Sequence, residues 1–377
     1  TLMEAILQKN QFLKALTHVQ NVVERRNTIP ILANILIIAE GVGLKLIATD
    51  LDIELIEEID AKIEKGGSLT APAHLVYDII RKLPDASEIT LSKDDNQDHL
   101  TIRSGKSNFK LQTLPRSDFP EISDNEFSHA FTIVSSELNR LIEKTRFAIS
   151  NEETRYYLNG IFFHEAKSAD EEKLSTLRTV STDGHRLAQA ELTLPEGAFG
   201  MPGVIIPRKT ISEIQKLTLE NDGDVEVKIS ENKLKFVFNS IEVTSKVIDG
   251  TFPDYQRVIP FQNDKAMTVK TNTLTNAVDR VATLSSERGR AVKLSLKDNS
   301  LTLSVTSPEA GTAIEEISVD FKGEDFEIGF NSKYLLDILS QLSGDTVKLL
   351  LSEPNSPCLV LDPNDEATLY VLMPMRV

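Results

Sequence analysis

Apolar residues recur at helical spacing in several segments of the chain, and each of these segments follows a short strand-like stretch. The first stretch begins at Met3 and leads into a segment with Phe12 and Leu16 on one face. Equivalent stretches begin near Phe131 and Met267, so the starts lie about 130 residues apart, which is the length of one domain. The pattern therefore predicts a threefold internal repeat.

Each third of the chain contains this strand and helix unit twice, and alternating strands follow each helix. The predicted helices cover 11–23, 72–83, 135–147, 207–218, 272–284 and 331–343. The repeat unit is β-α-β-β-β, and helices segregated from largely antiparallel sheets are typical of the α+β class. Turn-rich segments at 114–120 and 250–255 close the first two thirds. We therefore expect three similar domains at 1–128, 129–256 and 257–377.

The charge of the chain is unevenly distributed. The net charge is -16, which on its own argues against nucleic acid. The predicted helices nevertheless carry a net positive charge, with basic residues such as Lys14, Arg81, Lys82, Arg140, Lys144, Lys209 and Lys216. Two interpretations stay open: ordinary decoration of helix faces, or a basic helical layer that contacts phosphates while acidic sheets repel DNA.

Cys358 is the single cysteine, so it cannot form an internal disulfide, and we interpret it as a small packing residue in a reducing compartment. The segment 3–14 mixes charged and apolar residues, unlike a secretory signal, and no apolar run is long enough for a membrane span. We expect a cytoplasmic protein.

Carboxylates occur in two similar motifs, Thr-Asp-Leu-Asp at 49–52 and Thr-Asp-Gly-His-Arg at 182–186. One hypothesis is a metal-dependent hydrolase or transferase that uses Asp50, Asp52, Asp183 and His185. However, Asp50 and Asp183 occupy equivalent positions in successive repeats, so we expect each to stabilise a turn. No nucleotide-binding or hydrolase motif occurs. We therefore expect no catalytic residues, no metal and no cofactor.

Five segments carry more specific motifs. They read Pro-Ile-Leu-Ala-Asn at 30–34, Arg-Tyr-Tyr-Leu-Asn-Gly at 155–160, Thr-Asp-Gly-His-Arg-Leu at 182–187, Phe-Pro-Asp-Tyr at 252–255 and Tyr-Val-Leu-Met-Pro-Met-Arg-Val at 370–377. With these motifs in order and at domain spacing, the chain resembles the bacterial β sliding clamps over its whole length.

The resemblance implies a non-catalytic processivity factor: a head-to-tail homodimeric ring whose helices surround duplex DNA and whose antiparallel sheets lie outside. It also implies three kinds of protein partner: the replicative DNA polymerase, an ATP-dependent clamp loader, and other replication and repair proteins. A scaffold that binds only proteins is the alternative, and it predicts no retention on circular DNA.

The resemblance further implies a pocket for a partner peptide with leucine and aromatic anchors. Its residues would be Arg155, Leu158, Thr182, Gly184, His185, Arg186, Leu187, Pro253, Arg257, Val258, Asn331, Tyr334, Met373, Pro374, Met375 and Arg376. Methionines suit a pocket that serves several partners, although a methionine-containing terminal strand is more often core. Pro357 replaces a usually small polar residue there, which removes an N–H donor.

The remaining implied residues belong to the dimer interface and to DNA contacts. The interface would join edge strands through Arg103, Lys106, Phe109, Leu111, Leu284, Glu315 and Glu316. Phe109 and Leu111 could instead be ordinary core residues. For DNA, the implied residues are Arg26, Tyr156 and Tyr157, whereas the neighbouring Glu152 would repel phosphate and is excluded.

Overall fold

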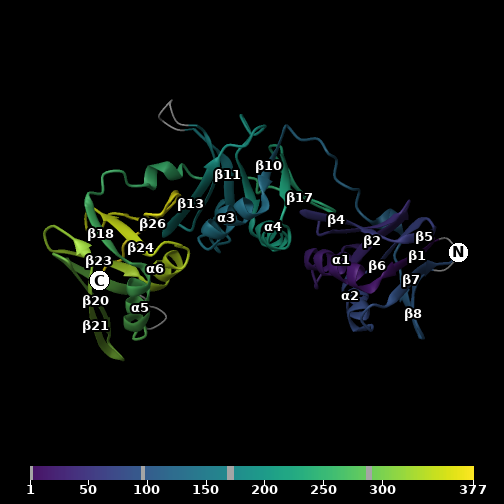
Figure 1. Ribbon diagram of the computed structural model, residues 1–377, viewed down its shortest axis with the longest axis horizontal. Helices are drawn as coiled ribbons and strands as arrows, with labels where there is room; N and C mark the ends of the chain where they lie inside the picture. The colour runs from purple at the N-terminus through teal and green to yellow at the C-terminus, as the bar shows by residue number, and fades with distance from the viewer. Residues whose placement is uncertain (1–2, 95–97, 168–173, 286–290) are drawn as a thin grey trace. The chain divides into compact units, whose positions relative to one another are not determined.

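The computed structural model describes residues 3–94, 98–167, 174–285 and 291–377. The chain forms two compact units, and many of their elements are labelled in Figure 1. Unit 1 comprises Thr1–Ser136, Glu196–Met201 and Ser212–Val247, and unit 2 comprises Glu137–Pro195, Pro202–Ile211 and Ile248–Val377. The first expected domain begins at residue 1, and residues 1–2 lie outside the described part.

Unit 1 contains two antiparallel sheets. The five-stranded sheet has the order β5 (Lys62–Lys65), β1 (Met3–Gln8), β7 (Glu88–Lys93), β8 (His99–Ser104) and β9 (Ser107–Gln112). The eight-stranded sheet has the order β10 (His129–Val134), β15 (Asp224–Ile229), β16 (Lys233–Phe238), β17 (Ile241–Lys246), β4 (Ile53–Asp60), β3 (Gly43–Thr49), β2 (Asn34–Glu40) and β6 (Gly67–Pro72).

Unit 2 also contains two antiparallel sheets. The nine-stranded sheet has the order β14 (Val204–Pro207), β11 (Gly160–Ala166), β12 (Thr176–Thr182), β13 (Arg186–Thr193), β26 (Asp365–Leu372), β25 (Cys358–Asp362), β24 (Thr346–Leu351), β18 (Lys265–Lys270) and β22 (Asp320–Phe321). The four-stranded sheet has the order β21 (Gly311–Ser318), β20 (Ser300–Ser307), β19 (Ala291–Lys297) and β23 (Phe326–Asn331).

The helices lie where the apolar periodicity predicts them. Among the described residues they are α1 (Lys9–Val22), α2 (Ala73–Lys82), α3 (Ser135–Arg146), α4 (Arg208–Glu220), α5 (Thr271–Ala282) and α6 (Ser332–Leu339). Short 3-10 helices are η1 (Pro30–Ala33), η2 (Arg116–Asp118), η3 (Tyr156–Leu158) and η4 (Tyr255–Val258). The helices bury their apolar stripes: Phe12 and Leu16 of α1 are 0% exposed.

Helix α6 is shorter than predicted because its last turn tightens. It begins at Ser332 after Asn331, whose side-chain oxygen accepts the N–H of Tyr334 at 3.1 Å and caps the helix. After Leu339 the backbone changes to i→i+3 hydrogen bonds, from Gln341 to Ile338 and from Leu342 to Leu339. Apolar spacing continues through this tighter turn, so the sequence alone places the end of the helix too late.

The two large sheets each run across an expected domain boundary. In unit 1, β17 pairs with β4, and Val243 lies opposite Leu55. In unit 2, β13 pairs with β26, and Leu187 lies opposite Val371. Strands of the expected central domain therefore pair with strands of the expected first domain in unit 1 and of the expected third domain in unit 2. This pairing explains why the two compact units do not follow the threefold repeat.

The packing role expected for Cys358 is confirmed, because its side chain is fully buried in the apolar core of unit 2. Asn299 adopts a φ of 60° in the turn between β19 and β20, a left-handed conformation that asparagine tolerates. No helix of the described residues is both long and apolar enough to cross a membrane.

A buried histidine ties three elements of unit 1 together. His18 of α1 bonds Glu57 of β4 through Nδ1 at 2.5 Å and Glu220 of α4 through Nε2 at 2.6 Å. Carboxylates only accept hydrogen bonds, so both ring nitrogens must carry protons and the imidazole is cationic. Burial alone would lower the pKa of His18, but the bonds and charges of the two carboxylates raise the pKa above 6.5.

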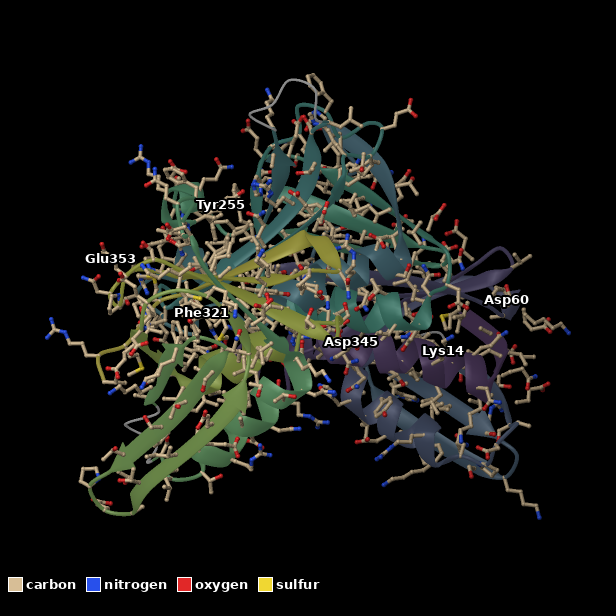
Figure 2. All side chains as sticks on the ribbon, turned by 60° about the vertical axis from the view of Figure 1, so that its left-hand side comes forward. Lys14, Asp60, Tyr255, Phe321, Asp345 and Glu353 are labelled. Atoms are coloured by element: carbon tan, nitrogen blue, oxygen red, sulfur yellow. The ribbon has the colours of Figure 1, made fainter. Side chains whose placement is uncertain are left out.

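His18 adjoins a cavity of about 360 Å³. Besides Glu57 and Glu220, the charged residues that line it are Lys14, Glu58 and Asp60; Lys14 and Asp60 are labelled in Figure 2. The carboxylates outnumber the cations around this cavity, so loss of the proton from His18 leaves an excess of negative charge at the junction of α1, β4 and α4.

We expect alkaline pH to weaken unit 1 through His18. Because the pKa is raised in the folded state, the stabilisation is complete below 6.5 and is lost as the pH rises through the folded pKa. The variant His18→Gln should lack this loss of stability. In a plot of the free energy of unfolding against pH, the slopes of the two proteins should differ by at most about 1.4 kcal/mol per pH unit. Urea unfolding at a series of pH values measures it, and parallel pH profiles for the two proteins would contradict the assignment.

Candidate functional site

The turn between β12 and β13 in unit 2 is held by its own side chains. The Asp183 carboxylate accepts the backbone N–H groups of His185 at 2.9 Å and Arg186 at 3.1 Å. The Thr182 hydroxyl donates to the carbonyl of Arg186 at 2.7 Å and accepts the N–H of Gly184 at 3.1 Å. Asp183 is therefore a structural residue of a tight turn, as the sequence predicts.

The equivalent turn in unit 1 repeats this pattern. Asp50 accepts the N–H groups of Asp52 and Ile53 at 2.9 and 2.8 Å, and Thr49 bonds Leu51 and Ile53. Within the described residues, no group of three or more histidine, cysteine or acidic side chains could hold a metal ion. The carboxylates at both turns shape the backbone, which removes the basis of the metal-dependent hydrolase hypothesis.

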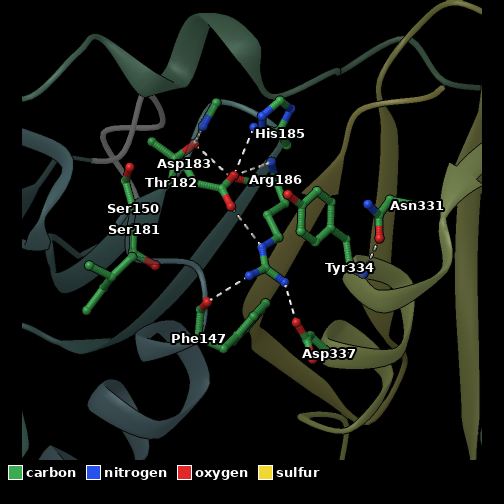
Figure 3. A network of polar contacts seen from close by, with 12 residues as sticks. Phe147, Ser150, Ser181, Thr182, Asp183, His185, Arg186, Asn331, Tyr334 and Asp337 are labelled. Carbon is green, nitrogen blue, oxygen red and sulfur yellow. Dashed lines mark hydrogen bonds and ion pairs between the residues drawn. The ribbon is translucent and has the colours of Figure 1, made fainter. Parts of the chain in front are cut away.

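Arg186 connects the turn to helix α6 (Figure 3). Its guanidinium donates to the Asp183 carboxylate at 3.2 Å, to the Asp337 carboxylate at 2.7 Å and to the Phe147 carbonyl at 3.0 Å. It also lies 4.4 Å from the ring centroid of Tyr334. Only 9% of the side chain is exposed. Arg186 is therefore a positioning residue for its neighbours, and each of its three nitrogen atoms donates a hydrogen bond inside the chain.

A second polar group holds the loop after Phe252. The Tyr255 hydroxyl accepts a hydrogen bond from Arg178 at 3.0 Å and lies 2.8 Å from Nε2 of His164. Burial, and next the charge of Arg178, lower the pKa of His164 to about 3, so the ring is neutral and Nε2 accepts the Tyr255 proton. Phe162 stacks on Phe252 with ring centroids 4.9 Å apart. These buried contacts hold the loop after Phe252 in place.

An apolar cluster reaches the surface beside these groups. Leu158, Leu187 and Val371 are each no more than 2% exposed and belong to one core cluster with Phe252 and Tyr255. Next to these residues along the chain, Val258 is 49% exposed and Met373 is 37% exposed. A buried apolar cluster whose neighbours along the chain are partly exposed valine and methionine side chains is typical of a surface that binds apolar anchors.

The end of the chain contributes to this surface. Met373 follows β26 and donates its N–H to the carbonyl of His185 at 3.0 Å. Met375 donates its N–H to the carbonyl of Gly329 in β23 at 2.7 Å, and the two residues form an isolated β-bridge. The methionine-containing segment therefore spans from the 182–186 turn to the four-stranded sheet, and both methionines are 37% exposed.

Most residues of the implied peptide pocket come together in unit 2. Arg155 donates to the Asp183 carbonyl at 2.9 Å, and His185 stacks on Tyr334 with ring centroids 5.8 Å apart. Arg257 is 85% exposed and pairs with Asp254. Among the described residues, the structure shows no hydrogen bond that joins the rest of the set to Pro253, Val258, Pro374 or Arg376. Pro357 precedes β25, and its carbonyl accepts from Asn263 at 2.9 Å.

Four of the seven implied interface residues lie on two edge strands. Phe109 and Leu111 belong to β9 and Glu315 and Glu316 to β21, the end strands of the five-stranded and four-stranded sheets, whereas Leu284 follows α5. Leu111 is only 8% exposed, so its side chain lies in the core of its own chain. Arg103 and Lys106 are exposed. Glu315 forms a bidentate pair with Arg280 at 2.8 and 2.9 Å.

The implied DNA contacts are exposed to different degrees. Arg26 is exposed in the loop after α1, and Tyr156 is 53% exposed at η3. Tyr157 is half-buried and meets Tyr156 edge-on, with ring centroids 5.8 Å apart. Glu152 accepts a hydrogen bond from Arg155 at 2.9 Å, so this carboxylate orients a residue of the implied peptide pocket.

Sequence reasoning missed the residues that act from behind the site. These are Phe147, His164, Arg178, Gly329 and Asp337. Their partners are far away in sequence, so no local pattern identifies them. Sequence reasoning also missed Arg280, which pairs with Glu315, and the 69% exposed Ile314 at the β21 edge.

Comparison with known proteins places the chain in a family. Models of the DNA polymerase III beta subunit match it three times: the N-terminal domain at 3–123, the central domain at 132–254 and the C-terminal domain at 256–376. The beta sliding clamp of Caulobacter vibrioides is 52% identical, with 100% of each chain covered. The chain belongs to the beta sliding clamp family.

Solved structures give the same result. The DNA polymerase III beta subunit of Bartonella birtlesii, bound to griselimycin, matches with a TM-score of 0.95 and 51% identity, covering 100% of each chain. That of Pseudomonas aeruginosa matches with a TM-score of 0.92 and 37% identity, also over 100% of each chain. The fold is therefore the three-domain DNA clamp fold. The chain is a sliding clamp of DNA polymerase III, a processivity factor and not an enzyme.

We expect Arg186→Met to destabilise unit 2. The variant leaves the Asp183 and Asp337 carboxylates without their cation and should lower the free energy of unfolding by about 2–3 kcal/mol. This is less than for a fully buried pair because Asp337 is 33% exposed. Urea unfolding measures the change. Arg280→Met is the matched control, since Arg280 is 60% exposed in its pair with Glu315, and an equal loss in both variants would argue against a special role of Arg186.

Proposed function

We propose that this clamp closes as a head-to-tail homodimer in which β9 of one protomer pairs with β21 of the other. The observation that carries this proposal is the presence of two open sheet edges. The eight-stranded and nine-stranded sheets continue across expected domain boundaries, whereas the other two sheets have five and four strands and end at β9 and β21. Joining them would form a third long sheet and would pair two exposed edges.

Side chains at the two edges support this pairing. Ile314 of β21 is 69% exposed, and Phe109 of β9 and Leu284 are half-buried, so apolar area is available on both sides. The exposed cations Arg103 and Lys106 would face the acidic β21 strand, which carries Glu315 and Glu316. Because Glu315 already pairs with Arg280, we expect Glu316 to supply more of the ionic match.

We propose that the ring encircles duplex DNA and contacts it without reading sequence. Arg26 and the Tyr156–Tyr157 pair would supply local contacts to phosphates or to unstacked bases. Some helical cations already form hydrogen bonds within the chain, which limits their contribution to DNA binding. Arg140 donates to Glu137 and Glu191, and Lys144 donates to the Gln341 carbonyl. Contact of this kind is compatible with sliding, because sequence-independent contacts to phosphates let a protein move along DNA.

We propose that the apolar surface of unit 2 binds short peptides of partner proteins. Leu158 and Leu187 would form the floor, and Val258, Met373 and Met375 the adaptable walls. The implied partners are the replicative polymerase subunit, the clamp loader and other replication and repair proteins. We also propose the domain limits 1–128, 129–256 and 257–377, and a cytoplasmic location, which the unpaired buried Cys358 supports.

We expect Ile314→Asp to open the ring. A carboxylate on the β21 edge would meet apolar area and the acidic residues of its own strand, so the dimer should dissociate into monomers in analytical ultracentrifugation. The control is Val42→Asp, at an 85% exposed position in the β2–β3 turn, which should stay dimeric. A dimeric Ile314→Asp protein would argue against the proposed edge.

The same variants test topological binding to DNA. The wild-type protein and Val42→Asp, loaded on nicked circular DNA with a clamp loader and ATP, should stay bound in high salt and leave when the DNA is linearised. Ile314→Asp should not be retained. Salt-sensitive binding that is indifferent to DNA ends would contradict encirclement.

We expect Val258→Asp to weaken peptide binding by about tenfold or more, since a charge would replace an apolar wall. The probe is a short fluorescein-labelled peptide with one leucine and one phenylalanine as anchors, and fluorescence anisotropy gives its affinity. Ile122→Asp, at a position that is 44% exposed compared with 49% for Val258, is the matched control. Unchanged affinity in Val258→Asp would place the peptide elsewhere.

A further inference from the structure

The C-terminal tail, defined here as Met373–Val377, is attached to two separate elements. The N–H of Met373 donates to the His185 carbonyl in the 182–186 turn, and the N–H of Met375 donates to the Gly329 carbonyl in β23. Pro374 lies between them and has no N–H to donate. The position of both methionine side chains therefore depends on how closely Met375 can approach β23.

That approach requires a residue without a side chain at position 329. A Cβ atom on Gly329 would lie 2.4 Å from Cγ1 of Val377 and 2.7 Å from the carbonyl oxygen of Met375. Carbon atoms do not approach this closely, and the Met375 oxygen is a backbone atom that cannot rotate away. Any side chain at position 329 would therefore push the tail away from β23.

The glycine is required for space and not for backbone conformation. Gly329 does not have a positive φ, in contrast to Gly184 and Gly311. It lies in a regular strand that pairs with β19, opposite Lys293, between the buried Ile328 and Phe330. Alanine fits such a strand, so we expect a substitution to leave β23 in place and to move the tail.

We propose that Gly329 is a positioning residue for peptide binding: the absence of a side chain seats the C-terminal tail on β23 and so places Met373 and Met375 at the edge of the peptide site. This inference rests on the proposed peptide site. It assigns a specific role to a residue that does not itself contact the peptide.

The test compares Gly329→Ala with Gly223→Ala in the full-length protein. At Gly223 the nearest atom to an added Cβ would be Oδ1 of Asn221, 3.8 Å away, so the same methyl group meets no clash. The probe is the fluorescein-labelled peptide with leucine and phenylalanine anchors. We expect Gly329→Ala to bind it about tenfold more weakly than the wild type, and Gly223→Ala to bind it equally well.

The chain offers a direct view of the tail by NMR. It has five methionines, and three of them, Met3, Met201 and Met267, are at most 7% exposed and lie outside the tail. With ¹³C-labelled methionine methyl groups, Gly329→Ala should shift the signals of Met373 and Met375 and leave the other three unchanged. Shifts of all five would indicate a general structural change and overturn the proposed role.

A second variant separates seating of the tail from loss of stability in β23. Val377→Gly removes the closest clash partner, so the double variant Gly329→Ala with Val377→Gly should recover part of the lost affinity. General destabilisation of the strand would give no such recovery and would overturn the inference.

The outcomes distinguish the inference from its premise. If the wild type binds the peptide and Gly329→Ala binds it equally tightly with unshifted methionine signals, the role of Gly329 is wrong and the peptide site stands. If the wild type does not bind the peptide, the site itself is wrong and the inference is overturned with it.

Discussion

The geometry of the site depends on the antiparallel pairing of β13 with β26. This ladder sets Arg186 opposite Leu372 and Leu187 opposite Val371, so the 182–186 turn lies beside the start of the C-terminal tail. A slip of one residue would move every side chain of a strand to the opposite face of the sheet. The burial of Leu187 and Val371 in one apolar cluster fixes the register, because a slip would remove both from that cluster. The backbone ladder therefore determines which side chains can meet.

Arg186 depends on that ladder and extends its effect to α6. A guanidinium that is 9% exposed is costly to bury unless its N–H groups find acceptors, and here two carboxylates and one carbonyl accept them. Asp337 lies on helix α6, the Phe147 carbonyl lies directly after α3, and Asp183 lies in the same turn as Arg186. The ion pairs thus hold side chains around a surface that is mainly apolar. Electrostatics fixes the shape of this surface, and in the proposed peptide site apolar contact would supply the affinity.

The repeats and the turns could be predicted from the sequence because they depend on neighbours along the chain. Apolar spacing located the six α-helices of the described residues within a few residues, and the Thr-Asp motif identified both tight turns. The family resemblance added the set of pocket residues, most of which come together in unit 2. Neither source could show that Arg186 points inward or that Glu315 is already paired with Arg280, since both depend on contacts made by the folded chain. The importance of Gly329 is likewise invisible without the position of Val377.

The two Thr-Asp turns show how the same turn can carry a charged group in one repeat and lack it in the other. Both turns need a residue with positive φ after the aspartate: Leu51 has a φ of 81° in unit 1, and Gly184 has a φ of 89° in unit 2. Leucine is strained in this conformation, so the first turn tolerates a cost of about 1–2 kcal/mol that glycine avoids. Yet strain alone does not explain the glycine, because Leu51 shows that the turn forms without one. A Cβ atom at Gly184 would lie 2.8 Å from the guanidinium of Arg155, which donates to the Asp183 carbonyl. Glycine at this position therefore makes room for a cation over the turn, and the shared scaffold acquires a charged group beside its apolar surface.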